Sequence, residues 1–151
     1  MTSFMELLNG DPEAWINSLD DYQVNTIRHL YSYTDDYDEV AKEWLSAAVY
    51  SNAPCGVANR FCMTFEKIQE EVYTFFCDKG KYGNHKSDLF SLKTLTEYYA
   101  IEFLSDVFSP VLGLSAAYLA PLVAIVLLKI SRVGLDKWIA NFKSKLDAEL
   151  K

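Results

Sequence analysis

The chain has few residues that break helices. Its 151 residues include only 6 glycines and 4 prolines, which argues against many short strands joined by glycine- and proline-rich turns. Half of the residues are hydrophobic and 15% are aromatic, a composition that excludes disorder and suffices for a buried core at this length. We therefore expect one helical domain over residues 1–151.

Basic residues are also in short supply. The chain has 14 Lys+Arg against 21 Asp+Glu, a net charge of −7, which argues against nucleic-acid binding because phosphates need clustered lysine and arginine. An acidic protein suits a basic partner better. The charge is uneven, since residues 1–110 carry 8 Lys+Arg and 18 Asp+Glu whereas residues 111–151 carry 6 and 3. This asymmetry indicates either a tail that meets something anionic or two parts that face each other.

Cysteine is scarce as well. Cys55, Cys62 and Cys77 form no CxxC pair, and the first residues lack the basic start and apolar stretch of a signal peptide. We therefore expect free thiols in a reducing cytoplasm. A zinc site made by the three cysteines and His85 is disfavoured, because structural zinc sites use closely spaced ligand pairs.

No catalytic or cofactor motif is present. His29 lies within a predicted helix and His85 in a basic turn, and neither belongs to a recognisable catalytic arrangement. The same turn, with Lys79, Lys81 and Lys86, lacks the GxxxxGK[ST] order of a phosphate-binding loop. We therefore expect no enzymatic activity, no cofactor and no bound metal.

Helical patterns fill most of the chain. Asp11, Pro12 and Glu13 predict a helix start, with a capping acceptor, a proline at the first helical position and an acid near the positive end of the helix dipole. Other segments combine a capping residue with apolar residues three and four positions apart. The predicted helices cover about 11–19, 20–33, 34–48, 61–77, 87–110, 111–128 and 130–146, with a loop at 51–59.

One segment carries no charge over 22 residues, Val107–Leu128. That length suffices to cross a bilayer, but it equally suits the buried centre of a helical bundle. The helices before it show apolar stripes that need a surface to cover, whereas a membrane span would require a folded acidic part to cross the membrane. The sequence therefore favours an all-α bundle of six or seven helices around a central apolar helix at about 111–128, kinked or divided at Pro121.

Acidic and aromatic residues gather at the start of the third predicted helix. The cluster consists of Asp35, Asp36, Tyr37, Asp38 and Glu39. Helix capping explains these acids without a ligand, and their spacing is not that of a calcium loop. The same mixture, with Asp20, Asp21 and Tyr33 nearby in sequence, suits the docking of a basic protein. The predicted function is non-catalytic binding of a protein partner by a cytoplasmic protein, in an adaptor, inhibitor or immunity-type role.

The sequence also predicts an alternative function at a membrane. The apolar segment 107–128 and the basic amphipathic segment 130–150 together predict a membrane-inserted or membrane-acting effector, in which the second segment contacts anionic lipids.

Overall fold

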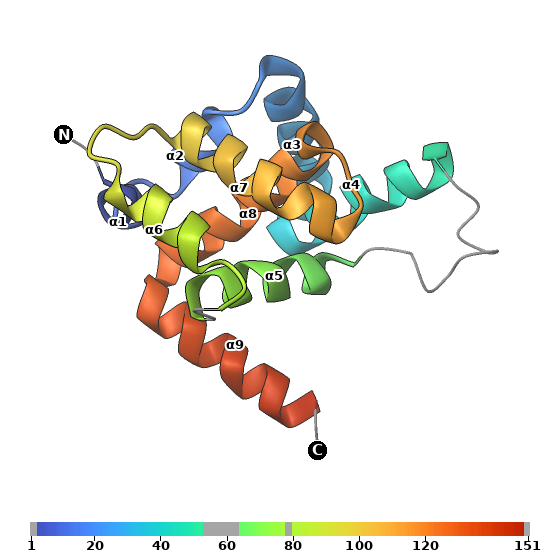
Figure 1. Cartoon of the computed structure of the whole chain (residues 1–151). Helices are drawn as coiled ribbons and strands as arrows, with labels where there is room; N and C mark the ends of the chain where they lie inside the picture. The colour runs from blue at the N-terminus through green and yellow to red at the C-terminus, as the bar shows by residue number, and fades with distance from the viewer. Residues whose placement is uncertain (1–2, 53–63, 78–79, 150–151) are drawn as a thin grey trace.

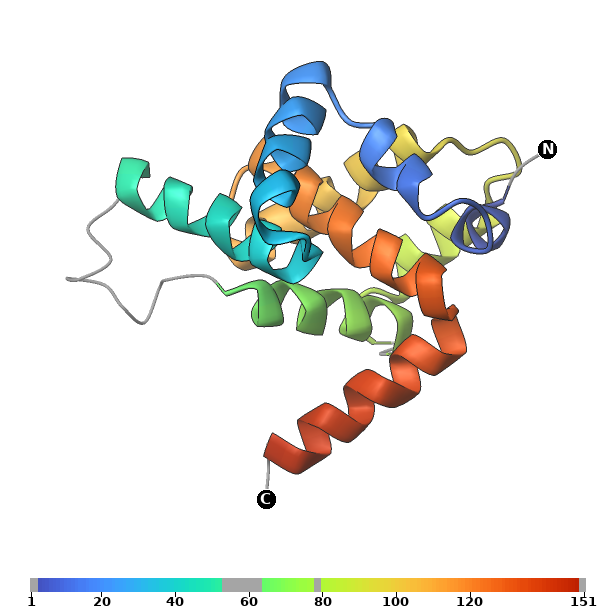
Figure 2. The same cartoon turned by 180° about the vertical axis from the view of Figure 1, so that it is seen from behind.

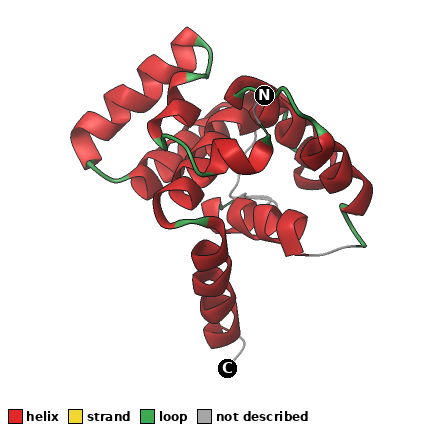
Figure 3. Ribbon diagram, turned by 90° about the vertical axis from the view of Figure 1, so that its left-hand side faces the viewer, coloured by secondary structure: helices red, strands yellow, loops and turns green. Residues whose placement is uncertain are grey.

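The computed structural model, which describes residues 3–52, 64–77 and 80–149, is an all-α fold, as the sequence predicted. The described residues form nine helices and no strand (Figures 1 and 3). The helices are α1 (Phe4–Leu8), α2 (Glu13–Asn17), α3 (Asp21–Thr34), α4 (Tyr37–Asn52), α5 (Phe65–Cys77), α6 (Gly83–Ser91), α7 (Glu97–Leu112), α8 (Ala116–Val133) and α9 (Leu135–Glu149).

Acidic side chains accept backbone N–H bonds at the starts of α2, α3 and α4. Asp11 Oδ1 accepts from the Glu13 N–H at 3.0 Å, and Asp36 Oδ1 accepts from the Asp38 N–H at 2.9 Å. Asp20 is the N-cap of α3 within a capping box. The helix starts predicted at these acids are therefore confirmed, because each cap satisfies backbone N–H groups that have no partner inside the helix.

α8 runs through the middle of the molecule (Figure 2). It contacts α1, α2, α4, α5, α7 and α9, and every residue from Pro121 to Leu128 is buried. A helix with neighbours on all sides is apolar all round. This arrangement accounts for residues 116–128 of the uncharged run, whereas residues 107–112 belong to the end of α7, so the predicted central helix begins at Ala116 rather than at about 111.

Pro121 does not divide α8, contrary to one form of the prediction. The helix continues from Ala116 to Val133 although a proline has no N–H to offer the carbonyl four residues earlier. Gln23 of α3, only 3% exposed, supplies the missing donor, since its Nε2 lies 3.0 Å from the Ala117 carbonyl oxygen. A side chain from another helix thus stabilises the interrupted backbone ladder.

The number of helices exceeds the predicted six or seven for two reasons. α1 was not predicted, although Ser3 caps it by accepting from the Glu6 N–H at 3.3 Å. The single helix predicted at 87–110 is two helices, α6 and α7, because Thr96 begins a new one by accepting from the Tyr99 N–H at 3.2 Å.

The predicted ends of two segments also change. Pro110 lies inside α7, which ends instead at Leu112, and the next residue, Gly113, has a positive φ of 73° and donates its N–H to the Ser109 carbonyl at 2.9 Å. Ser51 and Asn52 of the predicted loop belong to α4. The rest of that loop, and Phe61 of the next predicted helix, lie outside the described residues.

α9 extends away from the other helices (Figures 1 and 3). It turns off α8 at Gly134, whose φ of 95° is one that side chains disfavour. Its first turns contact α5, because the rings of Trp138 and Phe142 lie against Tyr73, with ring centroids 6.5 and 5.3 Å apart.

Candidate functional site

The predicted acidic cluster does not form one outward surface. Asp35, Asp36 and Glu39 are exposed, and they respectively end α3, cap α4 and pair with Lys42 at 3.3 Å. Each of the three therefore has a local structural role.

Tyr37 and Asp38 of the cluster are engaged with the rest of the fold. Tyr37 is 5% exposed and its hydroxyl donates to Glu13 Oε2 at 2.9 Å. Burial and this hydrogen bond raise the pKa of Tyr37 to about 12. Asp38 forms an ion pair with Lys129 at 2.7 Å.

The C-terminal end of α8 collects these inward-facing groups. Lys129 Nζ donates to Asp38 Oδ1 at 2.7 Å and to Gln69 Oε1 at 3.0 Å. Gln69 is buried, although charged residues lie close to it in the sequence at Lys67 and Glu70. Its burial has a reason, because it accepts from the only lysine on α8.

Two further residues of this end reach α2. Ser131 Oγ accepts from the indole N–H of the fully buried Trp15 at 2.8 Å, and Arg132 lies 3.3 Å from Glu13 Oε1. With the pairs of Lys129 and of Lys145 to Glu66, three ion pairs join residues 111–151 to residues 1–110. The basic and acidic parts of the chain therefore face each other, which was one of the two interpretations of the charge asymmetry.

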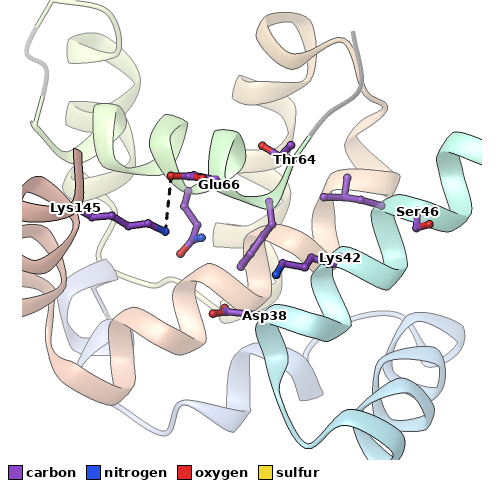
Figure 4. Close-up of a pocket in the computed structure, with 9 residues that line it drawn as sticks. Asp38, Lys42, Ser46, Thr64, Glu66 and Lys145 are labelled. Carbon is purple, nitrogen blue, oxygen red and sulfur yellow. Dashed lines mark ion pairs between the residues drawn. The ribbon is translucent and has the colours of Figure 1, made fainter. Parts of the chain in front are cut away.

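A hollow of about 530 Å³ opens between α4, α5 and α9 (Figure 4). It is lined by Asp38, Lys42, Leu45, Ser46, Thr64, Phe65, Glu66, Gln69 and Lys145. The two lysines and two acids all have partners of opposite charge, including the Lys145–Glu66 pair at 3.7 Å that Figure 4 marks. The hollow therefore favours neither an anion nor a cation.

A smaller hollow, of about 140 Å³, lies where α3 begins, between α7 and the first turns of α8. We call it the acidic recess. Its lining consists of Leu19, Asp20, Gln23, Tyr98, Ile101, Glu102, Ser105, Asp106, Ala116, Ala117 and Ala120. Three carboxylates thus line it together with uncharged residues, and no lysine or arginine is among these described lining residues.

The carboxylates of the recess have no basic partner. Asp20, Glu102 and Asp106 are exposed, and none of them pairs with a lysine or arginine within the described ranges. Glu102, as a hydrogen-bond acceptor and a negative charge, raises the pKa of the Tyr98 hydroxyl, and the negative charge of Asp20 adds to this effect. The positive N-terminal end of α8 offsets part of the negative charge.

Ser105 adds a buried polar group to the recess. It is 1% exposed, and its hydroxyl has no hydrogen-bond partner among the described residues. A buried hydroxyl without a partner is unfavourable, and in folded proteins such groups are rare enough to need an explanation.

Exposed tyrosines border the recess. Tyr22 and Tyr98 are 60% and 41% exposed, and the Tyr22 hydroxyl lies 3.4 Å from the side-chain nitrogen of Gln23. Tyrosine is enriched in protein interfaces because its ring adds contact area and its hydroxyl adds a hydrogen bond.

The other candidate residues contribute to packing or lie at the surface. His29 and His85 pack edge-on against Tyr33 and Phe103, at 5.0 and 6.3 Å. In the part of the chain that the structure describes, no group of three or more His, Cys, Asp or Glu could hold a metal ion. Cys77 is an exposed free thiol, whereas Cys55 and Cys62 lie outside the described residues.

The basic turn is engaged within the fold as well. Lys81 pairs with Glu71 at 2.7 Å, and Lys86 donates to the Phe76 carbonyl. Lys79 lies outside the described residues. The described lysines of this turn therefore serve internal contacts.

α8 is the one helix of the described residues that is long and apolar enough to cross a membrane, and 56% of its residues are buried in the fold. The basic segment predicted at 130–150 is divided at Gly134, so that Arg132 belongs to α8. α9 itself carries three lysines and three acids. The structure thus corrects the description of this segment as one basic helix.

The sequence interpretation missed the residues that α7 gives to the recess. Tyr98, Glu102 and Asp106 follow one another at four-residue intervals, and Ser105 lies on the same face of the helix. This spacing was a signal for a polar face. Asp20, by contrast, is more than 70 residues away in the chain, and only the tertiary structure brings it to this face.

Comparisons with protein-family models, with curated proteins and with solved structures found no match to this chain.

Proposed function

We propose that this protein acts without catalysis by binding a basic protein partner, in an adaptor, inhibitor or immunity-type role in the cytoplasm. The observation that carries the proposal is the acidic recess, where three carboxylates without basic partners stand beside exposed tyrosines. Complementary charge steers such a partner and fixes its orientation. Elsewhere, the acids of the 530 Å³ hollow already have partners within the fold.

The test begins with capture of partners from the native host by the full-length protein. We expect a complex of fixed stoichiometry by light scattering, whose Kd rises as the salt concentration rises, because exposed charges are screened. Tyr98→Ala should weaken the complex about tenfold, as expected for a tyrosine at an interface. Tyr33→Ala is the matched control, since Tyr33 is 76% exposed but lies outside the recess.

Two results would contradict this function. One is the failure to recover any partner in a fixed ratio, and the other is a complex whose affinity does not depend on salt. If Tyr98→Ala and Tyr33→Ala weakened the complex equally, the binding surface would have to include the other end of α3.

A membrane-acting effector is the second candidate, and the apolar length of α8 favours it. In that function α8 would leave the fold and enter a bilayer. Leakage of dye from vesicles of anionic phospholipid, dependent on protein concentration, would support it. If no leakage occurs over a range of pH and lipid composition, and alkaline carbonate leaves the protein in solution, this candidate is removed.

A further inference from the structure

We propose that the acidic recess binds the cationic end of one side chain, a lysine or an arginine, and that Ser105 accepts a hydrogen bond from it. The inference deepens the proposed function, on which it rests, because it names the group of the basic partner that the protein recognises.

Charge determines the sign of the ligand. Asp20, Glu102 and Asp106 line the recess without a lysine or arginine beside them. Ammonium and guanidinium groups carry only N–H donors, and the recess offers carboxylate and hydroxyl oxygens that accept. A charge-assisted hydrogen bond to a carboxylate is about twice as strong as one between neutral groups.

The hydroxyl of Ser105 is an independent observation that points to a ligand. It is 1% exposed and has no partner among the described residues, although a serine inside a helix often bonds to the carbonyl four residues earlier. An N–H donor placed in the recess would satisfy it. The neighbouring Gln23 does not do so, because its amide nitrogen donates to the Ala117 carbonyl oxygen at 3.0 Å and to the Tyr22 hydroxyl at 3.4 Å.

The size and walls of the recess fit a side chain rather than an ion. Its volume of about 140 Å³ exceeds the roughly 30 Å³ occupied by one water molecule in the liquid. Its carboxylates do not form a group that could hold a metal ion, and no other group of three or more His, Cys, Asp or Glu among the described residues does so. Ala116, Ala117, Ala120 and Ile101 supply apolar surface, against which lysine and arginine pack their aliphatic stems while the charged head meets acids.

The first experiment measures binding of small probes to the full-length protein by NMR. The probes are the Nα-acetyl amides of arginine and lysine, and the Nα-acetyl amide of citrulline, which has nearly the shape of arginine without its charge. We expect saturable shifts of the backbone signals of Glu102, Ser105 and Ala117 with one or both cations. Citrulline amide should bind at least tenfold more weakly than arginine amide.

Variants with matched charge locate the site. Glu102→Gln combined with Asp106→Asn should weaken binding of the cation at least tenfold. Asp35→Asn combined with Glu39→Gln removes the same charge at exposed positions outside the recess, and its Kd should stay within twofold of the wild type. Ser105→Ala should weaken binding several-fold while the circular dichroism spectrum stays unchanged.

Several outcomes would overturn the inference. These are equal binding of citrulline and arginine amides, equal losses in the two double variants, or shifts confined to residues outside the recess. Spermidine that binds a hundredfold more tightly than either amide would assign the recess to a free polyamine instead of a protein side chain.

Partner capture separates this inference from the proposed function. A captured partner that binds in a salt-dependent way, but is insensitive to Glu102→Gln with Asp106→Asn, would overturn the inference and leave the function. If the cationic probes bind but no partner is captured, the cation site stands and the proposed function is overturned.

Discussion

The two ends of α8 differ in whether the charged side chains around them are paired. At the C-terminal end Lys129 and Arg132 lie within 2.7 and 3.3 Å of Asp38 and Glu13, so the charges are paired within the fold. At the N-terminal end alanines face three acids that have no basic partner among the described residues.

The helix itself favours both arrangements, since its dipole stabilises cations at the C-terminal end and anions at the N-terminal end. The difference lies in what remains unsatisfied. Paired charges with satisfied hydrogen bonds contribute to stability, whereas unpaired acids around a buried hydroxyl without a partner are typical of a binding site. Variants at the two ends should therefore have opposite effects.

The largest effect should come from Lys129→Met at the C-terminal end. The change keeps an apolar stem but leaves Gln69 and Asp38 without their donor, and we expect the free energy of unfolding to fall by about 2 kcal/mol. Urea denaturation followed by circular dichroism measures it. Lys42→Met is the control, because the Lys42–Glu39 pair is exposed on both side chains, and it should change stability by less than about 0.5 kcal/mol. If the two variants lowered the free energy of unfolding equally, the contacts of Lys129 would stabilise the fold no more than an exposed ion pair does.

Gln23→Leu should come next. It removes the donor that serves the Ala117 carbonyl beside Pro121, and we expect a loss of about 1–2 kcal/mol. In a Pro121→Ala background the N–H of residue 121 can serve that carbonyl, so the loss should shrink. A double-mutant cycle measures this coupling. If Gln23→Leu costs the same in both backgrounds, the Gln23 amide does not replace the missing proline donor.

Tyr37→Phe should lower the free energy of unfolding by about 1 kcal/mol at pH 7, because it removes the hydrogen bond to Glu13. The pKa of Tyr37 is about 12 in the folded protein, whereas a tyrosine in an unfolded chain titrates near 10. Between about pH 10 and 12 the unfolded state releases a proton that the folded state keeps, so stability falls as the pH rises. The thermal midpoint, measured at increasing pH, should fall less steeply in Tyr37→Phe.

A matched variant checks the alkaline effect. Burial and a hydrogen bond to Glu71 also raise the pKa of Tyr82, so Tyr82→Phe should remove a separate part of the same pH dependence. If Tyr37→Phe leaves the slope of the wild type unchanged, Tyr37 does not contribute to it.

The smallest change in stability should be an increase, and we expect it for Ser105→Ala near the N-terminal end of α8. Ser105→Ala removes a buried hydroxyl without a partner and should raise the free energy of unfolding by about 0.5–1 kcal/mol. Ser109→Ala is the control on the same helix, because its hydroxyl donates to the Leu114 carbonyl at 2.6 Å, and it should lower stability by about 1 kcal/mol. A loss of stability in Ser105→Ala would show that its hydroxyl already has a partner.

Local signals in the sequence predicted much of the fold. The acids at positions 11, 20 and 36 mark helix starts because caps act within three residues of the chain. The apolar stripe of α5, with Phe65, Ile68 and Val72, is buried as predicted. The unpredicted starts of α1 and α7 also carry caps, at Ser3 and Thr96, so the signals were present and were overlooked.

Local sequence signals could not predict which distant residues pair with the polar side chains. The spacing of apolar residues does not indicate that Gln69 is buried, because its burial depends on the hydrogen bond from Lys129, 60 residues later. Pro121 predicted a break, but Gln23 repairs the ladder from another helix. The acidic cluster at 35–39 remains a prediction as a docking surface, although Tyr37 and Asp38 contact the interior of the fold.

Composition and short-range spacing suffice to predict that this chain is helical, acidic and divided into an acidic and a basic part. Which charges pair within the fold, and which acids have no basic partner among the described residues, follows from the packing of the helices. The reason is that ion pairs and recesses join residues far apart in the chain, such as Asp20 with Glu102 and Asp38 with Lys129.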